Sequence, residues 1–148
     1  RGEIGRRVEE AVTREIRLPS LEEALEDDDV GDVEAEAQGI VGELFDLMEA
    51  NRFGIKLLDR CMDHPEIQGL WQLHGREDVR RAIGRYIDDR TRTGHFRTFE
   101  DPRLAARMVI ETCTTWAVHI HWDRAPVAYD PVLARRNAIE FVVRGLLA

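Results

Sequence analysis

The chain has little of several residue types on which common catalytic sites depend. Ser20 is its only serine and Lys56 its only lysine, and two cysteines occur among 148 residues. A nucleophilic serine site would have to use Ser20, which we place in a helix cap. The Glu-x-x-His step that a di-iron helical bundle needs does not occur, and neither does a zinc-like Cys/His spacing. His119 and His121 are two residues apart on an expected helix, so they point to different sides. We therefore expect no catalytic residues, no metal and no cofactor.

Long apolar runs and an excess of basic charge are also lacking. No apolar run approaches the ~20 residues that a membrane crossing needs, and the start Arg1-Gly2-Glu3-Ile4 has no apolar signal core. We expect a cytoplasmic protein with no membrane partner. The formal net charge is −8, so the chain should bind a phosphate backbone poorly. Cys61 and Cys113 lie in apolar helical patterns, which favours buried thiols over a disulfide. Arginine supplies 20 of the 21 basic residues, which suggests a bacterial source with a GC-rich genome.

Helical periodicity is what the chain does have. Apolar residues predict an amphipathic helix over residues 4–17, and Ser20 with Glu23 predicts a capping box that opens a short second helix. An acidic stretch at 26–32 follows, and we interpret it as a solvated linker. We expect one domain over 1–148, with an N-terminal helix and linker over 1–32 and the main bundle over 33–148.

Helical spacing of apolar residues continues through the main bundle. It predicts a helix over 33–48 that Asn51 interrupts, a second over 53–62, a third opened by Pro65, and a fourth that ends at Gly94. Two last helices begin at Asp101-Pro102 and Asp130-Pro131, where a capping carboxylate precedes a proline. No strand-like alternation of useful length appears. The sequence therefore predicts an all-α bundle of about six to seven helices.

Each of the last two helices has two apolar faces, which one small domain cannot cover. The faces that are rich in small residues permit close helix approach, so we expect a homodimer through residues of about 102–122 and 130–147. The expected dimerisation residues are Ala106, Ile110, Cys113, Ala117, Ala134, Ala138, Phe141 and Gly145.

A further group combines large or adaptable side chains with polar tips. Any one of them could be a core residue, but together they suit an internal apolar pocket with a few groups that orient a ligand. The expected ligand-binding residues are Trp71, His74, Tyr86, Met108, Thr112, Trp116 and His119. The partner would be a largely hydrophobic small molecule.

An ordered set of features runs from Glu49 to the end of the chain, over about two thirds of its length: Asn51-Arg52 before Leu57-Leu58, His64-Pro65-Glu66, Gly94-His95-Phe96, Asp101-Pro102 with Ala105-Ala106-Arg107, Trp116-Ala117, and the closing Arg144-Gly145-Leu146-Leu147. In this order of features the chain resembles the effector-binding domain of TetR-family transcriptional regulators. Residues 1–32 do not resemble the family's helix-turn-helix segment, so we expect the DNA-binding head to be missing.

The resemblance implies a bundle with an internal effector pocket whose last two helices pair with a second copy. DNA would be bound only through the missing N-terminal domain. The alternative is a small helical enzyme or ligand-binding protein that acts without DNA.

Overall fold

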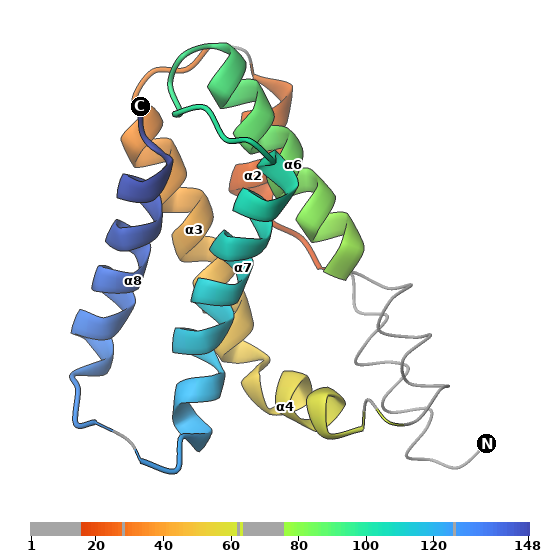
Figure 1. Cartoon of the computed structure of the whole chain (residues 1–148), viewed down its shortest axis with the longest axis vertical. Coiled ribbons are helices and arrows are strands. Elements are labelled where there is room, and N and C mark those ends of the chain that lie inside the picture. Colours follow the sequence, from red (N-terminus) through yellow and green to blue (C-terminus); the bar gives the residue numbers. More distant parts are fainter. Residues whose placement is uncertain (1–15, 28, 62, 64–75, 126) are drawn as a thin grey trace.

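The computed structural model describes residues 16–27, 29–61, 63, 76–125 and 127–148, and within them it is all-helical (Figure 1). Residues 4–15 of the first expected helix and the expected helix after Pro65 lie outside these residues, while Ile16 and Arg17 are described and are not helical. None of the described helices is long and apolar enough to cross a membrane. The described elements are α2 (Pro19–Glu26), α3 (Val33–Ala50), α4 (Arg52–Arg60), α6 (Arg76–Arg92), α7 (Pro102–Ala117), a 3-10 turn η1 (His119–Trp122) and α8 (Pro131–Leu146).

The bundle is organised around α3 and α7. Helix α7 packs against α6, α3 and α8, and α3 also packs against α8 and α2. Figure 1 shows α7 and α8 running in opposite directions beside each other, joined at their lower ends by the 118–130 connection. The core residues come from all of these helices, and Ala37, Ile87 and Ala106 have no exposed surface. One apolar core therefore joins α2, α3, α6, α7 and α8.

Helix α2 exists where the sequence predicts a short helix, but the predicted capping box is wrong. The helix begins one residue earlier, at Pro19, and its N-cap Leu18 provides no side-chain cap. Ser20 lies inside the first turn, where its backbone N–H donates to Glu43 at 3.0 Å and its hydroxyl to the same carboxylate at 3.4 Å. A carboxylate from α3 thus satisfies the helix start that Glu23 was expected to serve, and it fixes α2 on α3.

The helix boundaries at Asn51 and Gly94 are confirmed. Asn51 ends α3, and α4 begins at the next residue. After α6, Gly94 has φ +81°, a conformation that favours glycine, and the N–H groups of His95 and Phe96 return to the Arg90 carbonyl at 2.9 and 3.0 Å. The chain therefore turns sharply out of α6.

Both Asp-Pro helix starts are confirmed as well. The Asp101 carboxylate accepts from the Arg103 N–H at 2.9 Å, and that of Asp130 accepts from the N–H groups of Val132 and Leu133 at 2.8 and 3.2 Å. Helix α7 ends at Ala117, earlier than its apolar pattern indicates. The backbone leaves the helix at fully buried Val118 and continues as the 3-10 turn.

The end of the chain is tied to the α6–α7 loop. Phe96 and Leu147 form an isolated antiparallel bridge, in which the Arg97 N–H donates to the Leu146 carbonyl at 3.0 Å. The Ala148 N–H donates in turn to the His95 carbonyl at 3.2 Å. These bonds fix the upper end of α8 against the loop that leads into α7.

Candidate functional site

The outer surface of α7 and α8 exposes large apolar side chains. Phe141 is 76% exposed and Met108 61%, and Leu133 and Trp116 are about 40% exposed. The Trp116 ring meets the Tyr129 ring edge-on, with centroids 6.1 Å apart. A surface of this kind usually marks a place where another molecule binds. We call it the outer face and define it by the residues that line its two hollows.

The outer face is hollowed on either side of a common centre. The first hollow, of about 920 Å³, is lined mainly by Trp116, Tyr129, Leu133 and the small residues Ala134 and Ala138. The second, of about 660 Å³, extends past Phe99, Val109 and Gly145 to the C-terminal end of α8. We call them the tryptophan hollow and the C-terminal hollow.

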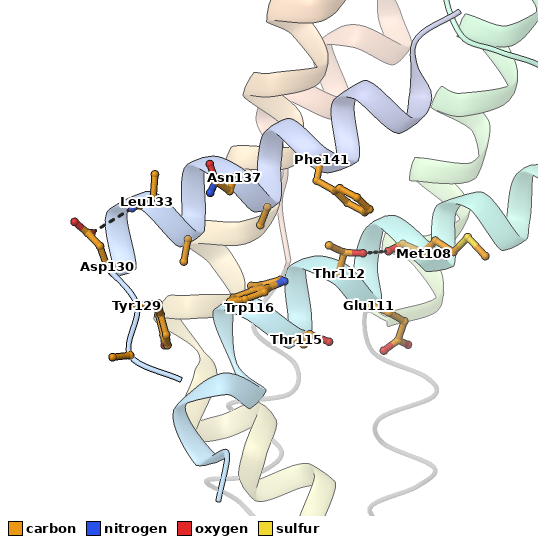
Figure 2. A pocket seen from close by; sticks show the side chains of 13 residues that line it. Met108, Glu111, Thr112, Thr115, Trp116, Tyr129, Asp130, Leu133, Asn137 and Phe141 are labelled. Carbon is orange, nitrogen blue, oxygen red and sulfur yellow. Dashed lines mark hydrogen bonds between the residues drawn. The ribbon is translucent and has the colours of Figure 1, made fainter. Parts of the chain in front are cut away.

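Four residues line both hollows and so form the centre of the outer face: Met108, Thr112, Asn137 and Phe141. Figure 2 shows Phe141 reaching from α8 over the groove toward α7, with Trp116 and Leu133 farther toward the start of α8. The Thr112 hydroxyl donates to the Met108 carbonyl at 2.8 Å, so it is used within its own helix. Asn137 is exposed in the middle of this apolar surface.

The charged residues differ between the two hollows. Glu111 and Asp130, both acidic, line the tryptophan hollow. Arg97, Arg144 and Glu140 line the C-terminal hollow, which gives it one more basic than acidic group. The outer face therefore has an acidic half and a basic half.

The residues expected at a dimer interface separate into two groups. Phe141 and Gly145 are exposed and Ala134 is half-buried, all on the outer face. The α7 residues Ala106, Ile110, Cys113 and Ala117, together with Ala138 of α8, are at most 7% exposed and belong to the core of the single chain. Their small side chains allow α7 to approach its neighbours within the bundle.

The residues expected in an internal ligand pocket are also divided. Met108, Thr112 and Trp116 lie on the outer face instead of the interior, so the structure places the two faces of α7 the other way round from the expectation. Tyr86 is buried away from that face, and Trp71 and His74 lie outside the described residues. His119 lies on η1, with its Nδ1 3.7 Å from an Asp59 carboxylate oxygen of α4.

A buried polar cluster that the sequence analysis did not identify holds Tyr86. The Tyr86 hydroxyl donates to Glu36 Oε1 at 2.8 Å, and Arg90 donates to both oxygens of the same carboxylate at 2.8 and 3.0 Å. Arg90, only 4% exposed, also donates to the Ala24 carbonyl at 2.8 Å. The cluster thus joins α2, α3 and α6. The position of Arg90 in the sequence could have revealed its burial, because Arg90 follows Ile83, Tyr86 and Ile87 on the core-facing side of α6.

The pKa directions in this cluster agree with a structural role. Burial alone would raise the pKa of the Glu36 carboxyl, but the hydrogen bonds from Arg90 and Tyr86 outweigh it and hold that pKa below its usual value. Burial, followed by the hydrogen bond to Glu36, raises the pKa of the Tyr86 phenol. Tyr86 therefore stays a neutral donor to a carboxylate anion, and its hydroxyl is already used.

The two cysteines show no sign of reactive chemistry. Both are free; Cys61 is half-buried at the end of α4 and Cys113 is 1% exposed in the core. Burial raises the pKa of the Cys113 thiol to about 12, so the reactive thiolate is scarce at neutral pH. Within the described parts of the chain, no three histidine, cysteine or acidic side chains gather as a metal site would require.

The fold is similar to that of a solved transcriptional regulator. Its coordinates are similar to those of the ketosteroid transcriptional regulator KstR2 of Mycobacterium tuberculosis, with a TM-score of 0.58 and 14% sequence identity. The match covers 87% of this chain and 64% of that chain, so this chain corresponds to about two thirds of that regulator's length. At this identity the likeness shows the fold alone. No protein-family model and no curated protein sequence matches the chain.

Proposed function

We propose that the chain is the effector-sensing and dimerisation domain of a TetR-like transcriptional regulator. The observation that carries the proposal is its likeness to a transcriptional regulator over most of its length. Within such a protein it would bind a small hydrophobic effector and control DNA binding by an N-terminal helix-turn-helix. The protein would be cytoplasmic, and it would contact DNA only through that head.

The outer face supports the dimerisation part of this proposal. Exposed Phe141, Met108 and Leu133 form an apolar surface over two neighbouring helices, and covering it would remove apolar area from water. A second copy of the chain offers the same surface, as the closed two-fold dimers common among soluble proteins require. We expect an interface of roughly 1,600 Å² in total.

The ligand part of the proposal rests on the regulator fold and on fewer residues than the sequence suggests. Met108, Thr112 and Trp116 are on the outer face, and the Tyr86 hydroxyl is taken by Glu36. His119, which lies beside α4, remains a candidate together with Trp71 and His74. We expect the effector to be largely apolar, with one or two hydrogen-bonding groups that such side chains can meet.

Sedimentation equilibrium and thermal unfolding test the two parts separately. We expect the wild-type chain to be a dimer at tens of micromolar, and Phe141→Glu to be a folded monomer because its side chain is exposed. Ala138→Glu is unsuitable for this purpose, since Ala138 is buried in the core. A wild-type chain that stays monomeric would contradict the dimerisation proposal.

For the ligand, a panel of apolar small molecules that includes steroids should contain members that raise the melting temperature. Any ligand that binds only the folded chain stabilises it by mass action. The increase should shrink in His119→Ala and persist in His121→Ala, the matched control two residues away. If no class of apolar compound stabilises the wild type, the effector part of the proposal fails.

A further inference from the structure

The outer face has the features of a surface that binds a copy of itself in one particular register. It bears a protruding side chain, Phe141, and beside it the tryptophan hollow, into which an aromatic ring could fit. A two-fold dimer needs the protrusion and the recess on the same surface, because each copy must both insert and receive.

The charges determine which way the copies face each other. A two-fold axis that lies in the interface, crosses α7 and α8 and passes through the centre of the outer face lays the acidic half of each copy over the basic half of the other. Glu111 and Asp130 then face Arg97 and Arg144, although Glu111 also pairs with Arg107 at 3.6 Å and Arg144 with Glu34 at 3.3 Å within the chain. An axis through either hollow would instead bring like charges of the two copies together, which costs energy.

The order of residues along α8 gives the position of each contact. Phe141 lies one turn beyond Asn137, and Leu133 lies about one turn before it. When the axis passes near Asn137, the partner's Phe141 therefore arrives level with Leu133. Because α7 runs antiparallel to α8, Trp116 lies toward the Leu133 end of the groove, as Figure 2 shows.

The side chain of Asn137 is suited to a position at the two-fold axis of the dimer. Its side-chain amide both donates and accepts, so two copies related by a two-fold axis can hydrogen-bond to each other. A polar residue in an otherwise apolar interface penalises shifted registers, which would leave its amide unpaired.

We propose that the tryptophan hollow is completed by Phe141 of a second copy, in a dimer whose two-fold axis passes between the Asn137 side chains. This inference rests on the proposed dimerisation. It adds the register: the Phe141 ring of each copy packs on Trp116 and Leu133 of the other, and the acidic and basic halves alternate across the interface.

Disulfide cross-linking between single introduced cysteines tests the register. The parent carries Cys61→Ala, and Cys113 is retained because it is buried. The five variants are Leu133→Cys, Asn137→Cys, Phe141→Cys, Gly145→Cys and, as a matched control, Arg136→Cys, an exposed neighbour of Asn137 that lines neither hollow.

Under mild oxidation we expect Asn137→Cys to link to itself about tenfold faster than Arg136→Cys, because the axis holds the two thiols at high effective concentration. Mixing Phe141→Cys chains with Leu133→Cys chains should give the mixed disulfide in preference to either symmetric one. Sedimentation of each reduced variant establishes first that it dimerises.

The outcomes separate this inference from the proposed function. If the chains dimerise but Leu133→Cys or Gly145→Cys links to itself fastest, the axis passes through a hollow and the inferred register is wrong, while the dimer stands. If Arg136→Cys links as fast as Asn137→Cys, the interface lies elsewhere and the inference is overturned. If the wild-type chain does not dimerise, the inference and the dimerisation proposal fail together.

Discussion

The guanidinium of Arg90, on α6, joins that helix to α2 and α3 through three hydrogen bonds. Its bonds reach the Glu36 carboxylate on α3 and the Ala24 carbonyl on α2, and its carbon lies 5.2 Å from the centre of the Tyr86 ring. Removing one partner of a buried ion pair leaves the other charge without compensation, which costs more than the pair itself contributes. Loss of Glu36 or Arg90 should therefore lower the free energy of unfolding more than loss of an exposed charged side chain does.

We expect Glu36→Gln to lower the free energy of unfolding by roughly 2 kcal/mol, since it removes the charge that opposes buried Arg90. Glu34→Gln is the matched control on the same helix. Glu34 contacts Arg144 at 3.3 Å, but both side chains are more than a third exposed, so its loss should cost less than about 0.5 kcal/mol. Urea unfolding at neutral pH measures both, and equal losses would contradict the role assigned to the cluster.

The stabilisation that Glu36 provides should depend on pH with a known sign. The pKa of Glu36 is lowered in the folded state from its ordinary value of 4.5, so its carboxylate stabilises the fold fully above that value. This stabilisation is lost as the pH falls through the lower, folded pKa. Comparing urea unfolding of wild type and Glu36→Gln from about pH 6 to about pH 3 should show the difference between them shrinking. A difference that stays constant over this range would contradict the assignment.

At the scale of helices, most boundaries could be predicted because short-range chemistry fixes them. Asn51, Gly94 and the two Asp-Pro pairs act on their own backbone neighbours, and the structure has helix ends at all of them. Ser20 was misassigned because its partner, Glu43, lies 23 residues away, and no local pattern reveals that contact.

The two apolar faces of α7 show what periodicity cannot decide. Spacing correctly groups Met108, Thr112 and Trp116 on one face and Ala106, Ile110 and Cys113 on another. It does not show which face turns inward, because both are apolar. Large side chains suggested the interior, yet the small residues are buried, since they let α7 pack closely against α3 and α6. Periodicity thus identified the two faces of α7 but not which of them is buried.

Capping sets the start of α8 and thereby the position of its outer side chains. We expect Asp130→Ala to lower the free energy of unfolding by about 1 kcal/mol, because the N–H groups of Val132 and Leu133 lose their acceptor. Asp123→Ala is a suitable control, since that carboxylate accepts from the Ala125 N–H and is the N-cap of none of the described α-helices. Thermal unfolding at one low protein concentration compares them, and a control that is destabilised as strongly would contradict the capping role.

For the whole molecule, charge governs what the chain can bind. Its formal net charge is −8, and binding to duplex DNA depends on neutralising phosphates with several basic groups. We expect this 148-residue chain to cause no retardation of DNA in a mobility-shift assay, even at low salt. Sequence-specific retardation at submicromolar concentration would show that the chain carries its own DNA-binding surface.

The hydrogen bonds between residues 146–148 and the α6–α7 loop also limit where related sequences can gain or lose residues. Residues 94–97 must reach Leu146–Ala148 in register, so an inserted or deleted residue there would break the bridge and shift Phe96, whose ring meets Tyr86 edge-on at 5.4 Å. The connection between η1 and α8 has no such partner strand, and its described residues from Asp123 to Asp130 are exposed. Natural insertions should therefore collect in that connection, while the spacing from Gly94 to α7 and from α8 to Leu147 stays fixed.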